Sequence, residues 1–245
     1  MSFFFKIISV LTILIGSFIA FSGPISQTGI IDWSTAFKLM QKLAPLLMIG
    51  AGLSLIGLIF AIFKKVPGLA LPSLLAIFIA GSVMASLMNM RSTAGEHPIH
   101  DITTDLVNPP AIIAGAKFDR KNPAIYVGDK DSGNGATVRE VQQKIYPDLA
   151  PQTFTQGQTI VFDAARASAL AQGWEILNED NVAGMIEATH KSRWFGFIDD
   201  ISIRIAPVEN GTRVDVRSKS RVGRSDLGAN VKRIRAFQAD LQERL

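Results

Sequence analysis

Long apolar runs fill the first part of the chain, and short alternating runs fill the rest. Three stretches, at about 7–22, 44–63 and 68–90, lack charged residues for about as long as a helix needs to cross a hydrocarbon core. A turn too short for anything but an antiparallel hairpin, Lys64 to Gly68, joins the last two. The pattern predicts three transmembrane helices and then a soluble domain over 91–245. The shortest run, 7–22, also fits a cleaved signal peptide.

Regular periodicity in the soluble part begins at Thr159. Helices are predicted over 159–171 and from an N-cap at Ser225 or Asp226 to the end, and strands over 174–178, 184–190, 194–205 and 212–221. The last helix has an apolar stripe that suits the apolar face of a sheet. The expected fold class is therefore α+β, a two-layer antiparallel sandwich in the order α-β-β-β-β-α. Residues 91–158, rich in Pro, Gly, Asp and Asn, are predicted to be mostly loop.

The last two strands carry the strongest hairpin signal, Asn210-Gly211, because a type I′ turn needs positive φ at both central residues. If these two residues form the turn, paired residue numbers sum to 421. Ile203 then faces Ser218 on the buried side, and Asp200 faces Arg221 on the other side.

The charge of the chain is unevenly distributed. Residues 1–90 contain five lysines, no arginine and one acid, Asp32, whereas residues 91–245 contain 20 basic and 20 acidic residues. A formally neutral soluble domain excludes nucleic acid as the leading partner. Positive-inside bias places the Lys64-Lys65 turn in the cytoplasm, although Lys38 and Lys42 compete with it. We therefore expect a multi-pass inner (plasma) membrane protein with a cytoplasmic N-terminus and a periplasmic, extracytoplasmic C-terminal domain.

The membrane part offers little chemistry of its own. The second and third spans contain no ionisable residue, so a transporter or channel is not expected. Small residues four positions apart, such as Gly50 with Ser54 and Gly81 with Ala85, favour packing inside the bundle over a docking face for another subunit. The segment 33–43 is interpreted either as a short interfacial helix or as a loop with an aromatic anchor.

Metal and thiol chemistry find weak support. The chain has no cysteine. Asp129, Asp131 and Glu140 match three positions of an EF-hand loop, but Asn134 stands where that loop needs glycine. A capping box from Thr137 to Glu140 is the simpler interpretation. The group His97, His100 and Asp101 lacks a third histidine, so the expectation is no metal and no cofactor.

A run of charged and small residues at the end of the sheet resembles a known family. It comprises 197–200, the segment 217–230 and Arg233. These residues resemble the uncharacterised family called domain of unknown function 1499, over most of 91–245. The resemblance implies a bacterial envelope or plastid protein and carries no established reaction. A Cys-Ser motif of many members has no counterpart here.

The same run supplies the candidate ligand-binding residues, for which two interpretations are open. One is a cross-strand ion-pair network that anchors the last helix. The other is a pocket, with Ser218 and Ser220 lining it and Arg217 and Arg221 at its rim to receive a carboxylate or phosphate. The full candidate set is Asp199, Asp200, Arg217, Ser218, Ser220, Arg221, Arg224, Asp226, Asn230 and Arg233.

Function is predicted only in outline. The sequence has no nucleophile elbow, Walker loop, dinucleotide fingerprint or zinc-protease helix. We expect a non-enzymatic module, anchored in the lipid bilayer, that binds an anionic small molecule, a lipid head group or another envelope or membrane protein. The alternative is an envelope hydrolase or lipid-modifying enzyme that uses Asp199 or Asp200 beside Ser218.

Overall fold

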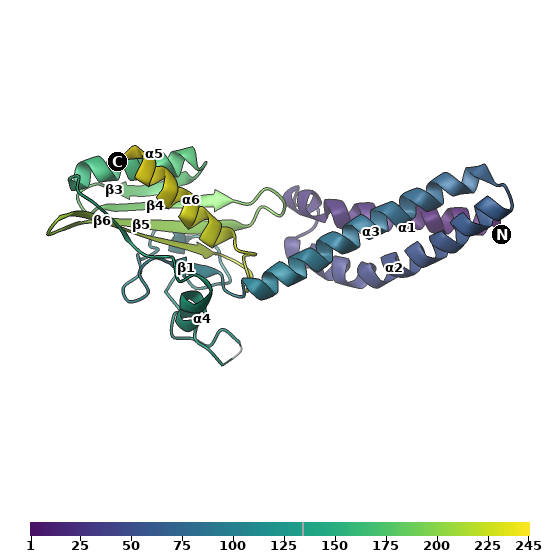
Figure 1. Cartoon of the computed structure of the whole chain (residues 1–245), viewed down its shortest axis with the longest axis horizontal. Helices are drawn as coiled ribbons and strands as arrows, with labels where there is room; N and C mark the ends of the chain where they lie inside the picture. Colours follow the sequence, from purple (N-terminus) through teal and green to yellow (C-terminus); the bar gives the residue numbers. More distant parts are fainter. Residues whose placement is uncertain (134) are drawn as a thin grey trace. The chain divides into compact units, whose positions relative to one another are not determined.

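The computed structural model describes residues 1–133 and 135–245 and divides into two compact units. Unit 1 comprises Met1–Ser92 and the short loop Arg193–Gly196. Unit 2 comprises Thr93–Ser192 and Phe197–Leu245. Figure 1 labels most of the helices and strands of both units.

Unit 1 is a helical bundle. Its helices are α1 (Ser2–Gln27), α2 (Trp33–Phe63) and α3 (Pro67–Glu96), the last of which ends in unit 2. All three are long and apolar enough to cross a membrane, as the sequence predicts. Each helix runs through an internal proline, at Pro24, Pro45 and Pro72 respectively.

Small and hydroxyl residues hold the bundle together. The Ser9 hydroxyl lies 3.2 Å from that of Ser54 and 3.1 Å from that of Ser73, so all three helices meet at one buried point. A Cβ on Gly50 would lie 2.2 Å from Thr12 Oγ1, which shows how closely α1 approaches α2. Gly81, by contrast, has open space around it. Gly50 and Ser54 thus pack inside the bundle as predicted, and Gly81 does not.

The segment 33–43 is the first part of α2. Asp32 caps it, accepting hydrogen bonds from the backbone amides of Ser34 (2.9 Å) and Thr35 (3.0 Å). The expectation of a separate interfacial helix, or of a loop, was wrong because α2 continues without a break through Pro45.

Unit 2 contains a six-stranded antiparallel sheet with helices, which confirms the α+β class. Its elements are β1 (Asp101–Thr103), η1 (Gly115–Lys117), α4 (Val138–Ile145), β2 (Gln152–Phe154), α5 (Gln158–Ala171), β3 (Glu175–Asp180), β4 (Met185–Lys191), β5 (Ile198–Val208), β6 (Gly211–Ser220) and α6 (Ala229–Arg244). From α5 onward the order is the predicted α-β-β-β-β-α. The strands lie in the order β1-β6-β5-β4-β3, and β2 also pairs with β6. Residues 91–158 contribute the two short strands that the sequence does not reveal.

The β5–β6 hairpin differs from its predicted register by two residues. Val208 pairs with Gly211, so the two-residue loop is Glu209-Asn210 and paired numbers sum to 419. Ile203 consequently faces Val216, and Asp200 faces Lys219. The predicted pairs with Ser218 and Arg221 were wrong. A shift of two preserves the face of every side chain, because strand side chains alternate with period two.

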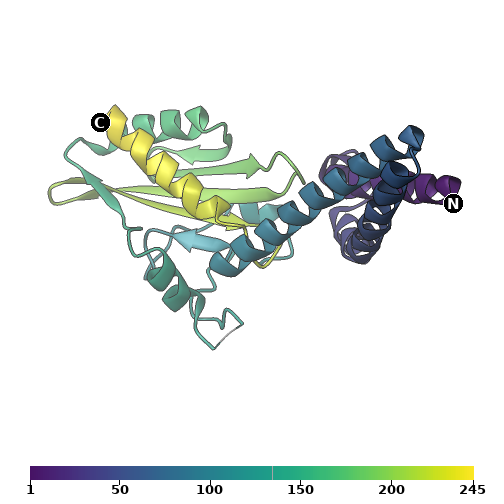
Figure 2. The same cartoon turned by 45° about the vertical axis from the view of Figure 1, so that its right-hand side comes forward.

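One face of the sheet is apolar. Ile201, Ile203 and Ile205 of β5 are buried on it together with residues of α5 and α6. Trp174 stacks on Phe237 of α6 with ring centroids 5.3 Å apart. Figure 2 shows α6 lying across the sheet. This face carries the hydrophobic core of unit 2.

Helix α6 begins later than predicted. Its N-cap is Gly228, and both Leu227 (φ 56°) and Gly228 (φ 76°) adopt left-handed conformations. The prediction of an N-cap at Ser225 or Asp226 was wrong because the chain makes this extra turn first. Asp226 still serves the helix start, since its carboxylate accepts hydrogen bonds from the amides of Gly228 (2.8 Å) and Asn230 (2.8 Å).

Candidate functional site

Arg233 of α6 organises the polar end of the apolar face. Its guanidinium donates to Asp199 Oδ2 (2.8 Å), Ser218 Oγ (2.9 Å) and His190 Nδ1 (3.1 Å). Because arginine only donates, the His190 nitrogen is the acceptor. Burial, followed by the Arg233 charge, lowers the pKa of His190. Arg233 therefore ties α6 to β4, β5 and β6.

Asn230, one turn earlier, completes this polar end. Its side-chain oxygen accepts from Ser218 Oγ (2.6 Å), and its amide nitrogen donates to Ser220 Oγ (3.1 Å) and to the His100 carbonyl (3.1 Å). Burial raises the pKa of Asp226, against the two amide hydrogen bonds that it receives. Ser218 and Ser220 are thus occupied by internal hydrogen bonds.

The opposite face of the sheet is charged, and residues 104–126, here called the strap, cover it. Asp101 of β1 is completely buried there. Its carboxylate accepts hydrogen bonds from Nε (2.8 Å) and Nη2 (2.9 Å) of Arg217 and from Nζ of Lys219 (2.7 Å). Burial acts to raise the pKa of Asp101, but the Arg217 hydrogen bonds and the two positive charges outweigh it and lower that pKa.

The strap is fixed to these same charges through its backbone. Arg217 donates to the carbonyls of Pro110 (3.3 Å) and Ala124 (3.0 Å), and Lys219 donates to that of Ile125 (2.9 Å). Glu187 of β4 accepts from the strap amides of Ile113, Ala114 and Gly115 at 2.8, 2.8 and 3.3 Å. The charged side chains therefore replace an apolar layer as the contact between sheet and strap.

A second buried cluster surrounds Asp200. Arg221 reaches it through Nη2 (2.7 Å) and Nε (3.0 Å), and Arg120 of the strap reaches it through Nη1 (2.9 Å). The Arg221 guanidinium also lies 4.5 Å from the centroid of the Phe118 ring. Arg120 Nη2 is buried and has no hydrogen-bond partner within the described protein.

The sheet therefore separates the predicted site residues. Asp199, Ser218, Ser220, Asn230 and Arg233 lie on the apolar-core side, and Asp200, Arg217 and Arg221 lie on the charged side. The expected pocket, with Ser218 and Ser220 between Arg217 and Arg221, is not brought together, because adjacent residues of a strand point to opposite faces. For the same reason Asp199 and Asp200 do not present two carboxylates to one substrate.

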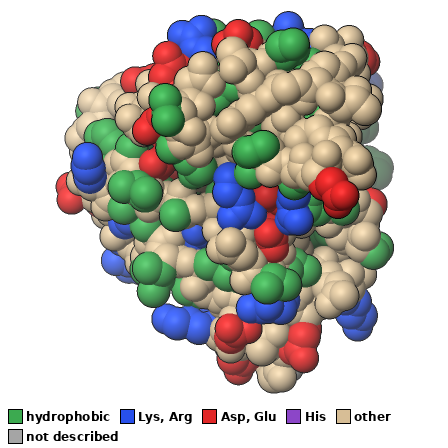
Figure 3. Space-filling model, turned by 90° about the vertical axis from the view of Figure 1, so that its left-hand side faces the viewer, with side chains coloured by type: hydrophobic (Ala, Val, Ile, Leu, Met, Phe, Trp, Pro, Cys, Tyr) green, Lys and Arg blue, Asp and Glu red, His purple; other side chains and the backbone are tan. Residues whose placement is uncertain are grey.

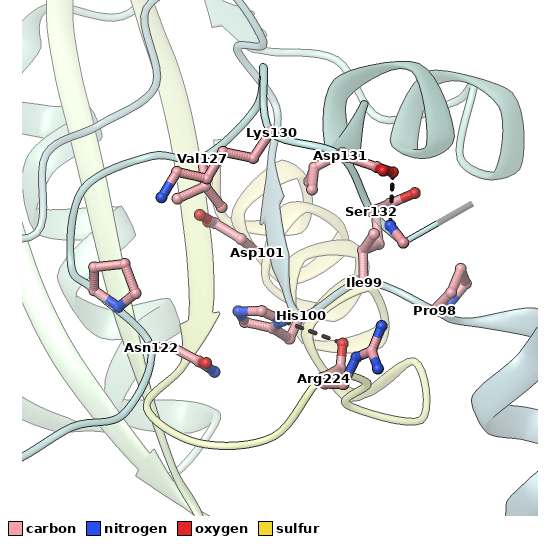
Figure 4. Close-up of a pocket in the computed structure, with 13 residues that line it drawn as sticks. Pro98, Ile99, His100, Asp101, Asn122, Val127, Lys130, Asp131, Ser132 and Arg224 are labelled. Atoms are coloured by element: carbon pink, nitrogen blue, oxygen red, sulfur yellow. Dashed lines mark hydrogen bonds between the residues drawn. The ribbon is translucent and has the colours of Figure 1, made fainter. Parts of the chain in front are cut away.

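A hollow of about 260 Å³ opens beside the charged face (Figure 4). The first residues after α3 form one wall, the end of the strap forms another, and the loop before α4 and the residue Arg224 complete it. Its lining residues are Pro98, Ile99, His100, Asp101, Asn122, Pro123, Val127, Lys130, Asp131, Ser132, Gly133, Val138 and Arg224.

Two exposed cations at the hollow have no ion-pair partner in the part of the chain that the structure describes. They are Lys130 and Arg224, which lie on opposite sides of the hollow in Figure 4. The nearby carboxylate of Asp131 is engaged elsewhere, because it accepts from the amides of Gly133 (2.7 Å) and Gly135 (3.0 Å). The hollow thus offers positive charge that no ion pair of the described chain uses.

His100 lies between these cations in the same view. Its Nδ1 is 3.2 Å from the Arg224 carbonyl. A carbonyl only accepts, so Nδ1 carries the proton and Nε2 has a free lone pair. Burial lowers the pKa of His100, against the hydrogen bond to Arg224, which raises it. The imidazole is therefore neutral near pH 7 and adds a hydrogen-bond acceptor to the hollow.

Sequence comparison bears directly on these residues. The model of the family described as "Protein of unknown function (DUF1499)" matches residues 101–241. The chain belongs to the DUF1499 family. The match begins at Asp101 of the charged face and includes most of α6. The expected resemblance is therefore confirmed.

Other comparisons add little to the DUF1499 assignment. No curated protein matches the chain. Among solved structures, the protein TTHA0849 from Thermus thermophilus is similar with a TM-score of 0.26 and 10% sequence identity, over 39% of this chain and 93% of that one.

In this DUF1499 protein, the residues of the EF-hand-like pattern and of the His97, His100 and Asp101 group make local contacts within the protein. Glu140 and Thr137 form the predicted capping box, with Thr137 N donating to Glu140 Oε2 at 2.8 Å. Asp129 pairs with Arg139 at 2.9 Å. Asn134 lies outside the described residues. His97 contacts the Tyr146 hydroxyl at 2.6 Å, so His97, His100 and Asp101 each have a different partner.

Sequence reasoning missed the role of several residues of the DUF1499 domain. It did not anticipate Arg120, Glu187 or Lys219 as buried charges, nor Lys130 as part of a hollow. The alternation of β6 carried a signal for Lys219, because it places Lys219 on the same face as Arg217 and Arg221. No comparable pattern exists for the strap, whose sequence lacks periodicity.

Proposed function

We propose that this DUF1499 protein is a membrane-tethered, non-enzymatic module whose hollow binds a small anion on the extracytoplasmic side. Three helices suited to a membrane support the tether. The basic turn at Lys64 and Lys65 between α2 and α3 supports the orientation, because lysines favour the cytoplasmic side. With that turn inside, the chain that follows α3 lies outside.

One observation carries the choice of the hollow. The buried arginines of the family-like run are each bound to a carboxylate, Arg217 to Asp101, Arg221 to Asp200 and Arg233 to Asp199. Arg224 is exposed and has no such partner among the described residues. A guanidinium binds carboxylates and phosphates through paired N–H groups, so Arg224 is suited to an external anion.

The size and walls of the hollow agree with a small ligand. A volume of about 260 Å³ lies below the roughly 300–1,000 Å³ of sites for drug-sized molecules. Pro98, Ile99, Pro123 and Val127 add apolar surface for a carbon skeleton. This hypothesis therefore favours a small anion over a partner protein.

Calorimetric titration of the full chain in neutral detergent with inorganic phosphate, sulfate and succinate tests the proposal. We expect saturable binding of at least one of these anions, and a loss of about tenfold in affinity in Arg224→Gln, the equivalent of one charge-assisted hydrogen bond. Lys232→Gln, which removes an exposed charge on α6, is the matched control and should bind normally. Absence of saturable binding, or equal affinity in Arg224→Gln, would refute the proposal.

A further inference from the structure

If the hollow binds a small anion, as proposed above, its lining residues also indicate which kind of anion. We infer that the ligand of the hollow is a phosphate ester with a hydroxyl group close to the phosphate, the chemistry of a glycerophosphate. Three features support it: two cations, one neutral acceptor, and a short tether to the membrane.

The two cations favour a phosphate over a simple carboxylate. Arg224 presents a planar fork and Lys130 a compact ammonium, and neither has a carboxylate partner among the described residues. A phosphate ester carries between one and two negative charges and three or fewer free oxygens, so it spreads charge in more than one direction. A simple carboxylate has one charge in one plane. The hollow therefore matches the ester better.

The neutral imidazole of His100 requires a hydrogen-bond donor on the ligand. His100 Nδ1 is bound to the Arg224 carbonyl, so the free Nε2 lone pair accepts. Above its second pKa of about 6 the ester is mostly dianionic, so its phosphate, like a carboxylate, offers Nε2 only acceptors and no hydrogen bond. A hydroxyl on the carbon skeleton supplies the missing donor, and the apolar residues Ile99 and Val127 accommodate the carbons.

The chain length between membrane and hollow keeps the site near lipid head groups. Helix α3 ends at Glu96, and His100 follows four residues later. At about 1.5 Å per helical residue and at most about 3.6 Å per extended residue, His100 lies within about 24 Å of Met90, the last apolar residue of the predicted span. Phospholipid head groups at the end of that span are phosphate esters, and soluble glycerophosphates share their chemistry.

Three matched ligands separate the features. Glycerol 3-phosphate carries the phosphate and the hydroxyls, propyl phosphate lacks the hydroxyls, and glycerate replaces the phosphate by a carboxylate. In calorimetric titrations of the full chain, we expect glycerol 3-phosphate to bind about tenfold more tightly than each of the others. In His100→Phe the preference over propyl phosphate should disappear, while Lys232→Gln should keep it.

The outcomes distinguish this inference from the broader proposal. If glycerate binds as tightly as glycerol 3-phosphate, or propyl phosphate does so in the wild type, the inference fails while anion binding stands. If no anion binds saturably, both fail. The wild-type comparison requires no variant, so it holds even if His100→Phe does not fold.

Nanodiscs identify the source of the ester. The apparent affinity for glycerol 3-phosphate is measured in discs of phosphatidylcholine and in discs that also contain phosphatidylglycerol, with phosphatidylserine as the control for surface charge. A loss of affinity specific to phosphatidylglycerol indicates that the lipid head group occupies the hollow. Equal affinity in the two anionic discs indicates a soluble ester.

Discussion

The two faces of the sheet in unit 2 are buried by opposite means. On one face, Ile201, Ile203 and Ile205 lie in a hydrophobic core with side chains of α5 and α6, and polar contacts gather at the end that Arg233 occupies. On the other, Asp101 and Asp200 bind arginine and lysine side chains, which in turn hold the backbone of the strap. Apolar packing tolerates small errors of shape, whereas a buried charge without its partner is very costly. The charged face therefore determines one arrangement of the strap.

The outer surface differs from both buried faces. In Figure 3, Lys, Arg, Asp and Glu side chains lie interspersed on the visible side of the molecule, and no single sign dominates it. This agrees with the equal numbers of basic and acidic residues over 91–245.

The largest effect is expected at the centre of the charged face. Asp101→Asn removes the counter-charge of Arg217 and Lys219, both buried, and should lower the free energy of unfolding of the full chain by about 3–5 kcal/mol. Denaturant titration in detergent, followed by tryptophan fluorescence, measures it. Asp148→Asn breaks an exposed pair with Arg235 and should cost about 0–1 kcal/mol. Equal losses of unfolding free energy in the two variants would show that the buried charges contribute no more than an exposed pair.

A slightly smaller loss is expected on the apolar face. Ile203→Ala leaves a cavity in the core and should cost about 2–5 kcal/mol in the same measurement. Val182→Ala, at a side chain that is 95% exposed, should change the free energy of unfolding very little. A loss in Ile203→Ala as small as that in Val182→Ala would show that the core does not sustain the fold.

The pH dependence of unfolding distinguishes the two faces. The pKa of Asp101 is lower in the folded chain than in the unfolded chain, where it is about 3.9. Its contribution to the free energy of unfolding is therefore complete above that value and is lost as pH falls through the lower folded pKa. Asp101→Asn should flatten the acid limb of the stability curve, whereas Ile203→Ala should only displace it downward. An acid limb of unchanged slope in Asp101→Asn would refute this assignment.

The smallest effect on stability is expected at the hollow. Arg224 is exposed and makes no ion pair with the described residues, so Arg224→Gln should change the free energy of unfolding by less than about 0.5 kcal/mol. A loss above about 1 kcal/mol would show that Arg224 supports the fold, as the other arginines of the run do.

Much of the fold could be predicted because it rests on periodicity. Apolar runs revealed three helices long and apolar enough to cross a membrane, and alternation revealed four strands and the face of each β5 and β6 residue, even though the hairpin register was wrong by two. The turn was misplaced because Asn210-Gly211 is a strong local signal, but strand pairing places Gly211 inside β6.

The site was less accessible to sequence reasoning. Counting charges cannot show which arginines form internal ion pairs. The partner of Arg217, Asp101, lies 116 positions away in the chain. The strap has no regular pattern, so neither its position on the sheet nor the hollow at its end could be derived. Of the ten candidate residues, Arg224 is the one that lines the hollow without a carboxylate partner among the described residues.

The most direct test asks whether Arg217 stabilises the fold while Arg224 binds the ligand. The denaturation midpoint of the full chain is measured with and without saturating inorganic phosphate, because a ligand that binds the folded state raises the midpoint. Arg224→Gln should keep the phosphate-free midpoint of the wild type and lose the increase, whereas Arg217→Gln should have a lower midpoint and keep the increase. A lower midpoint in Arg224→Gln, or an increase lost only in Arg217→Gln, would contradict the account.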